Sequence, residues 1–153
     1  MPAEKVRSYL MEHGIPYRMD IHQLAYTAQD IAHVEHIPEQ QIAKAVMVQA
    51  DGQLVMAVVA GDRHLDLEKT RKALGATTVR LAQEAEFSPA FPDCEKGAEP
   101  PFGVLYNVGT VVDVGLKSPR ITFNAGTHTS TISMELSDYL ALTRPMVVDI
   151  ASA

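Results

Sequence analysis

The stretch "IAKAVMVQADGQLVMAVVAG", residues 42–61, decides the fold. Two apolar runs, 42–50 and 53–60, flank the dipeptide Asp51-Gly52. An Asp-Gly pair between apolar runs is a strong hairpin signal, because both turn residues must take positive φ. Gly61 follows the second run and ends it. The stretch therefore predicts two antiparallel strands joined by a tight turn.

Lys44 lies inside the first of these runs, among aliphatic residues and Met. The period-2 alternation of a strand places it on the same face as Ile42, Val46 and Val48. In one interpretation Lys44 begins the strand and extends its ammonium to water along the aliphatic surface. In the other it is a cation at the mouth of a pocket, facing an anionic or carbonyl group of a ligand. A buried lysine also changes its pKa readily, which leaves proton-transfer roles open.

Helices and strands are expected in an irregular order along the rest of the chain. Helical spacing and capping signals predict helices from Val6 to Gly14, from Thr27 to Glu35, from Asp66 to Gly75, and from Ser137 to a point before Pro145, with a short one near 82–87. Strands are expected at 16–22, 77–81, 104–107, 110–114, 120–124 and 129–135. No regular βαβ rhythm appears, so we expect one α/β domain over 1–153, with a mixed sheet that curls.

Composition and charge exclude several classes of protein. Apolar residues make up 46% of the 153 residues, which is enough for a real core. No apolar run approaches the length of a membrane span, the first residues lack a secretory pattern, and Cys94 is the single cysteine. We therefore expect a cytoplasmic protein with no membrane association and no cofactor.

The net charge of −6 argues against a protein that coats nucleic acid, and we expect no DNA partner. It does not exclude an enzyme that holds only the end of an RNA. Basic residues gather within 61–80, at Arg63, Lys69, Arg71, Lys72 and Arg80. These residues form either a solvated helix face or a small patch that faces phosphate.

The stretch "GAEPPFG", residues 97–103, combines two glycines with two prolines. Prolines fix φ and glycines permit unusual backbone angles, so the loop is stiff and its remaining N–H groups have set directions. It is either an ordinary surface turn or a rigid wall that presents backbone amides to a substrate oxygen.

A third stretch, "FNAGTHTS", residues 123–130, reads as a plain hairpin turn, although Asn124 and His128 could also face a ligand. His33 and His36 have a spacing that suits a metal, but the pattern offers no third ligand, so we expect no metal site. Cys94 has no local base, which makes a cysteine nucleophile a poor explanation.

These stretches occur in the order found in one family. The chain resembles the YbaK/prolyl-tRNA synthetase-associated domain family of aminoacyl-tRNA editing deacylases, through "IAKAVMV", "GDRHLDLEKTRKALGA", "GAEPPFG" and "FNAG". The resemblance spans about residues 15 to 145. It implies a compact α/β domain whose mixed sheet curls towards a barrel, with helices packed outside.

The resemblance also implies a set of site residues. The family's central lysine corresponds to Lys44, and its Gly-x-x-Pro loop to Gly97, Ala98, Glu99 and Pro100, with Pro101 beside it. His22, at the end of the first strand, lies where members carry a polar or aromatic residue. Asn124 and Gly126 belong to the last matching stretch, "FNAG", and they are expected to contact substrate, as is His128, which follows that stretch. The sequence departs from the family at Glu99, where an apolar residue is more usual.

The implied activity is hydrolysis of the ester that joins a wrong, small amino acid to the 3′ end of a tRNA. An aminoacyl ester is already activated, so the amides of Gly97 and Ala98 could stabilise the oxyanion while the substrate's ribose hydroxyl helps to activate water. The expected partners are a mischarged tRNA and an aminoacyl-tRNA synthetase. The alternatives are a non-catalytic module that binds tRNA or a synthetase, and a hydrolase of small esters or amides.

Overall fold

The computed structural model describes residues 4–153. Its α-helices are α1 Glu4–Glu12, α2 Ala28–Glu35, α3 Leu67–Leu74, α4 Glu84–Phe87 and α5 Leu136–Thr143. Its 3-10 helices are η1 Glu39–Gln41, η2 Ser88–Ala90 and η3 Gly103–Tyr106. Its strands are β1 Arg18–Ile21, β2 Ala43–Ala50, β3 Gln53–Ala60, β4 His64–Leu65, β5 Val79–Leu81, β6 Gly109–Asp113, β7 Arg120–Asn124, β8 Ser130–Glu135, β9 Met146–Val148 and β10 Ala151–Ser152.

The predicted hairpin forms the middle of the larger sheet. Strands β2 and β3 pair antiparallel from Ala43–Ala60 to Ala50–Gln53, and Asp51 and Gly52 take φ of 50° and 80° as the turn requires. The sheet order is β5-β2-β3-β6-β9, with β6 parallel to both β3 and β9. The expectation of an α/β domain with a mixed sheet is confirmed.

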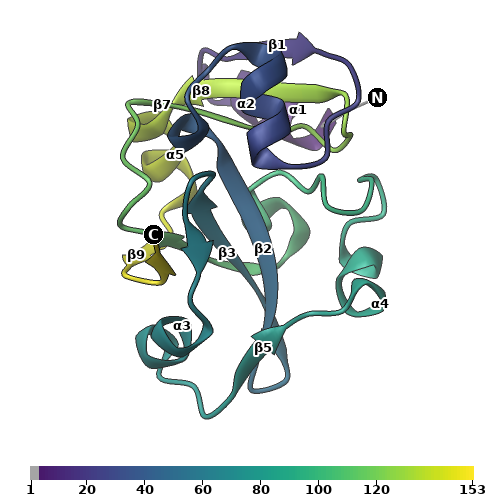
Figure 1. Ribbon diagram of the computed structural model, residues 1–153. Helices are drawn as coiled ribbons and strands as arrows, with labels where there is room; N and C mark the ends of the chain where they lie inside the picture. The colour runs from purple at the N-terminus through teal and green to yellow at the C-terminus, as the bar shows by residue number, and fades with distance from the viewer. Residues whose placement is uncertain (1–3) are drawn as a thin grey trace.

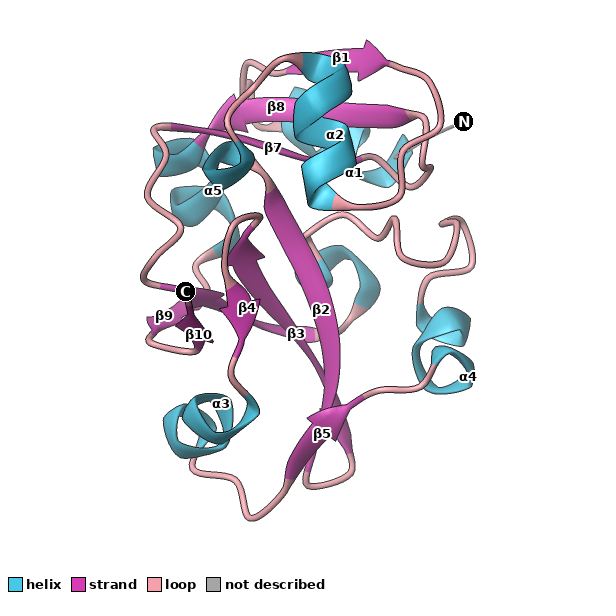
Figure 2. Ribbon diagram, in the orientation of Figure 1, coloured by secondary structure: helices cyan, strands magenta, loops and turns pink. Residues whose placement is uncertain are grey.

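A second, antiparallel sheet in the order β1-β8-β7 lies across one end of β2 (Figures 1 and 2). A parallel bridge between Ile42 and Thr122 joins it to β2. Over residues 4–153 the strands do not close into a barrel, although the two sheets turn towards one another through this bridge.

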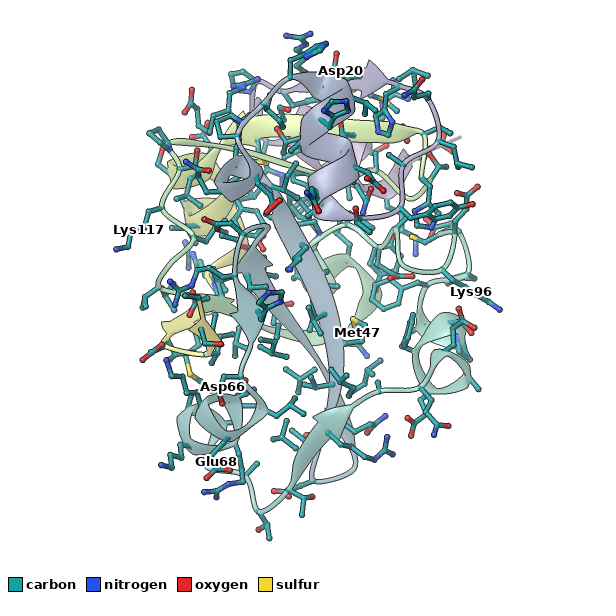
Figure 3. All side chains as sticks on the ribbon, in the orientation of Figure 1. Asp20, Met47, Asp66, Glu68, Lys96 and Lys117 are labelled. Carbon is teal, nitrogen blue, oxygen red and sulfur yellow. The ribbon has the colours of Figure 1, made fainter. Side chains whose placement is uncertain are left out.

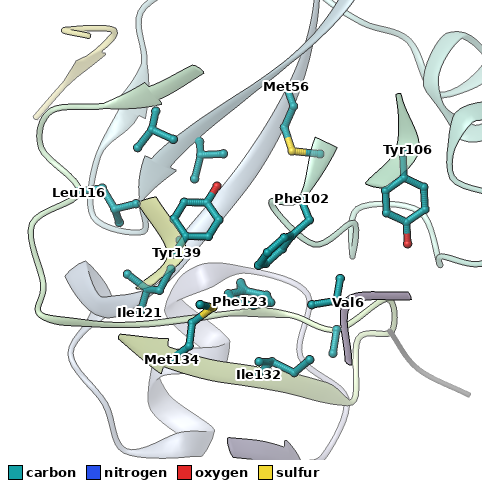
Figure 4. Close-up of a cluster of buried hydrophobic side chains, with 14 of the residues drawn as sticks. Val6, Met56, Phe102, Tyr106, Leu116, Ile121, Phe123, Ile132, Met134 and Tyr139 are labelled. Carbon is teal, nitrogen blue, oxygen red and sulfur yellow. The ribbon is translucent and has the colours of Figure 1, made fainter. Parts of the chain in front are cut away.

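The main core lies between the two sheets (Figure 4). The aromatic rings of Phe102, Phe123 and Tyr139 meet there with ring centroids 5.3–5.4 Å apart. The opposite faces of β2 contribute to different clusters, because Ala43 and Met47 pack in this core whereas Ile42 packs against Ile31 of α2. The alternation inferred from the sequence therefore holds, and it puts Lys44 on the α2 side of the strand.

Local signals predicted most helix ends correctly. Thr27 and Asp66 accept hydrogen bonds from the backbone N–H of Asp30 and Lys69, and Gly75 closes α3 with φ of 64°. Two expectations were wrong. Residues 104–107 lie in and just after the 3-10 helix η3, because the turn closes through the Val108 N–H and the Gly103 carbonyl. The last helix begins after Glu135, so Ser137 lies inside it.

No helix within residues 4–153 is long and apolar enough to cross a bilayer.

Candidate functional site

Lys44 lies two residues from the bridge that joins the sheets, and its ammonium is half-buried. Its Nζ donates to the Gly61 carbonyl at 3.5 Å. Burial lowers the pKa of Lys44, while the nearby carboxylates of Glu39 and Asp62 act in the opposite direction. The side chain is therefore a partly desolvated ammonium whose charge is supported by two acids.

The ammonium faces a small hollow of about 270 Å³, which we call the Lys44 hollow. Its lining consists of Thr27, Ala28, Gln29, Glu39, Lys44, Gly61, Asp62 and His64. Thr27, Ala28 and Gln29 are the cap and first turn of α2, whose dipole adds positive potential beside Lys44. The hollow is at the small end of ligand pockets, which commonly have volumes of ~300–1,000 Å³, so it suits a small oxygen-bearing group.

The second predicted element, "GAEPPFG" at residues 97–103, lies in the loop of residues 95–101 and the start of η3, and it is held by several contacts. Gly97 takes φ of +83°, which disfavours other residues, while Ala98, Glu99, Pro100 and Pro101 are all buried. The hydroxyl of the buried Tyr139 donates to the Pro101 carbonyl at 2.6 Å and ties the loop to α5. Most of the loop thus lies beneath the surface, and its stiffness stays a prediction.

The amides expected to face a substrate oxygen are engaged within the protein. The Gly97 N–H donates to Oε2 of Glu99 at 3.2 Å, and the Ala98 N–H donates to the Glu95 carbonyl at 3.0 Å. In this arrangement neither amide is an open donor, because each already has an acceptor. Their role at an oxyanion stays a prediction, and it requires that one of these bonds be released.

The loop is bonded to the third predicted stretch, the turn of residues 124–128. Gly126 exchanges two backbone hydrogen bonds with the loop, donating to Ala98 at 3.0 Å and accepting from Glu95 at 2.8 Å. The amide of Asn124 donates to the Gly97 carbonyl at 3.5 Å. Sequence stretches about 27 residues apart thus form one cluster, as the resemblance implied.

His128 completes this cluster. Its Nε2 is 2.7 Å from the Lys96 carbonyl, and a carbonyl can only accept, so Nε2 carries a proton. That Nδ1 is buried and has no hydrogen-bond partner within the described chain, and the same is true of Oδ1 of Asn124. The imidazole also packs against the exposed ring of Tyr26, with 4.7 Å between centroids.

A short segment that the sequence patterns did not single out connects the two parts of the site. Ala25 donates to the His128 carbonyl at 3.1 Å, while Thr27, two residues later, lines the Lys44 hollow. The Lys44 hollow and the 95–101 loop therefore lie on either side of residues 25–29. The helix-capping signal at Thr27 was the only sequence feature that marked this segment.

His22 is not brought together with these residues. Its side chain is 5% exposed and places Nε2 3.4 Å from Oε2 of Glu35, which also accepts from the Thr131 hydroxyl at 2.6 Å. His22 lines a separate hollow together with His33 and His36. Within residues 4–153, no group of three or more His, Cys, Asp or Glu side chains is arranged to hold a metal.

The basic residues of 61–80 are largely neutralised within the chain. The pairs are Arg63 with Asp113, Lys69 with Asp149, Arg71 with Glu68, and Arg80 with Glu86. Four of the five cations thus have a carboxylate partner, which favours the solvated-face interpretation over a phosphate patch. Cys94 is also unsuited to nucleophilic attack, because burial raises the pKa of its thiol to about 12.

Comparison with known proteins places this geometry in a family. A model of the aminoacyl-tRNA editing domain matches residues 22–142, which include Lys44 and both loops. The chain belongs to this family. A relative from Escherichia coli K12, named multifunctional Ser/Thr-tRNA deacylase ProXp-y, is 26% identical over 152 residues, covering 95% of this chain and 90% of the relative.

The chain is also similar to part of a larger enzyme and to a solved structure. A proline–tRNA ligase of Thiobacillus denitrificans is 35% identical over 78 residues, which are 51% of this chain and 13% of the ligase. A crystal structure described as a candidate trans-editing enzyme for prolyl tRNA synthetase has a TM-score of 0.84 at 23% identity, covering 99% of this chain and 97% of that one. The fold is thus shared over almost the whole editing domain.

Proposed function

We propose that the protein is a trans-editing hydrolase, which deacylates tRNA carrying a wrong, small amino acid. The observation that carries the proposal is the half-buried ammonium of Lys44 in its small hollow, within a chain of the aminoacyl-tRNA editing family. The E. coli relative is named as a Ser/Thr-tRNA deacylase, and serine and threonine esters are the first substrates to test here.

To hydrolyse the ester, the protein needs to position the reactants and to supply charge. The ester is activated, so the reaction needs a placed water and stabilisation of the oxyanion that forms. Lys44 supplies a positive charge beside the first turn of α2, and the ribose hydroxyl next to the ester assists the water. Within residues 4–153, the Thr27 hydroxyl beside Lys44 accepts from the Asp30 N–H and is not bonded to a base, which fits this substrate-assisted route.

The partners follow from the substrate. The 3′ end of a mischarged tRNA occupies the site, and an aminoacyl-tRNA synthetase supplies that tRNA. The pairing of most cations in 61–80 limits the protein's own grip on a tRNA body, which is consistent with recognition confined to the acylated end.

A panel of mischarged tRNAs tests the proposal. Purified protein is incubated with seryl-, threonyl-, alanyl- and cysteinyl-tRNA, and the charged fraction is followed against spontaneous hydrolysis without protein. Faster loss of at least one ester is the expected result. Retention of tRNA without ester loss would instead identify a binding module, and turnover of free amino-acid esters without any tRNA requirement would identify a general esterase.

A further inference from the structure

The carboxyl group of Glu99 is buried in the 95–101 loop and makes no ion pair, although the nearby His128 lowers its pKa against the larger effect of burial. The residue is 6% exposed, and burial raises the pKa of the carboxyl. Among residues 4–153, Glu99 takes part in no ion pair, since no Lys, Arg or His nitrogen lies within 4.0 Å of its carboxyl oxygens. Buried carboxylates are ordinarily paired with a cation or coordinated, so this one is arranged for a partner that the described chain does not supply.

The position of Glu99 defines which part of a ligand it would meet. Its Oε2 accepts from the Gly97 N–H at 3.2 Å, so the buried carboxyl group lies against the backbone of an exposed residue of the loop turn. The same turn adjoins His128 and Asn124, whose buried Nδ1 and Oδ1 atoms also lack partners. The Glu99 carboxyl and the Asn124 side-chain oxygen therefore lie beside this turn as acceptors, and a ligand group that satisfies them must donate hydrogen bonds.

The proposed substrate carries one such group. In an aminoacyl ester the α-ammonium is separated from the scissile carbonyl carbon by a single carbon atom. A protein group that binds the ammonium must therefore lie within a few ångströms of the groups that contact the carbonyl. Glu99 and the amide of Gly97 satisfy this requirement, since they belong to one turn and touch each other.

We propose that Glu99 binds the α-ammonium of the esterified amino acid and so makes the enzyme selective for a free amino group. The inference rests on the proposed function and deepens it. The ammonium competes with the Gly97 N–H for the carboxylate, and the released amide is then directed at the carbonyl oxygen. Binding of the α-ammonium would thus free the Gly97 N–H, which is bonded to Glu99 in the structure, to act as a donor to the carbonyl oxygen.

The test compares a free with a blocked amino group. One aminoacyl-tRNA that the wild type hydrolyses is prepared in two forms, unmodified and N-acetylated, and both are offered to wild type and to Glu99→Gln. The glutamine keeps an acceptor for the Gly97 N–H but has no charge. Glu12→Gln, which alters an exposed acid at the end of α1, is the matched control, and thermal unfolding verifies that each variant folds.

The expected result is at least about a tenfold preference of the wild type and of Glu12→Gln for the unmodified ester. In Glu99→Gln that preference is lost, because kcat/KM falls for the unmodified ester and stays the same for the acetylated one. Equal hydrolysis of both esters by the wild type, or a full preference in Glu99→Gln, would overturn the role of Glu99 in binding the ammonium. Either result would leave the proposed deacylase function standing. Failure of the wild type to hydrolyse any charged tRNA would overturn the proposed function and the assignment with it.

Discussion

At Lys44, burial and two carboxylates act in opposite directions on one pKa. Burial is the larger effect and lowers the pKa of the ammonium, while Glu39 and then Asp62 raise it. The strand provides aliphatic neighbours that limit the access of water, and the acids keep the charge in place. The ammonium is thus less strongly hydrated than that of a surface lysine, which increases the effect of its charge on an oxygen atom nearby.

The balance at Lys44 predicts a change in pH dependence. Removing either acid removes an attraction to the ammonium, so the pKa of Lys44 should fall further in Glu39→Gln and, by less, in Asp62→Asn. If the charged form is required, the alkaline limb of the rate profile moves to lower pH in both variants. Deacylation rates across alkaline pH, corrected for spontaneous hydrolysis, measure this, and an unmoved limb would show that Lys44 does not act as a cation.

Glu99 predicts a change in stability with pH. Its pKa is raised on folding from the ordinary value of 4.5, so the folded state binds the proton more tightly than the unfolded chain does. The stability of the wild type is therefore lost as pH rises from about 4.5 through the folded-state pKa, a loss that Glu99→Gln cannot show. The Tm of the variant minus that of the wild type should grow over this interval in thermal melts. A constant or shrinking difference would contradict the burial of an unpaired acid.

Among the elements, the 95–101 loop depends on the positive φ of Gly97. Gly52 offers a matched comparison, because Gly97 and Gly52 take φ of +83° and +80°. At neither position would an added Cβ atom clash with a neighbouring atom. Alanine at either position should cost about 1–2 kcal/mol in the free energy of unfolding, measured with denaturant. Only Gly97→Ala should also reduce the deacylation rate, since only that strain is in the site. Equal deacylation rates for the two variants would show that the 95–101 loop takes no part in the reaction.

Elements that depend on adjacent residues could be predicted from the sequence. Elements that depend on pairing with a distant segment of the chain could not. The Asp51-Gly52 turn, the Thr27 cap and the Gly75 terminus each depend on a few adjacent residues, and all three were read correctly. Strands β4, β9 and β10 were missed because they are short and exist through pairing with segments far along the chain. The error at 104–107 has a similar origin, since apolar side chains reach the core there from a turn.

For the whole molecule, the resemblance grouped residues into one site, and the structure brings only some of them together. Gly97, Ala98, Asn124, Gly126 and His128 do form one cluster. The sequence could not show that Glu99 takes the Gly97 amide, because a side chain that folds back on its own loop leaves no periodic signal. Nor could it show that the cations of 61–80 are paired with acids up to about 80 residues away.

The account's central claim is that Lys44 is the polar group on which deacylation depends. The most direct measurement is the single-turnover rate of hydrolysis of one mischarged tRNA by wild type, Lys44→Ala and Lys117→Ala. Lys117 is an exposed lysine that projects from the outside of the molecule, and it controls for a general loss of positive charge (Figure 3). We predict a rate for Lys44→Ala about a hundredfold or more below the wild type, as for the loss of one stabilising donor, with Lys117→Ala unchanged. A Lys44→Ala protein that folds and hydrolyses the ester at the wild-type rate would contradict the claim.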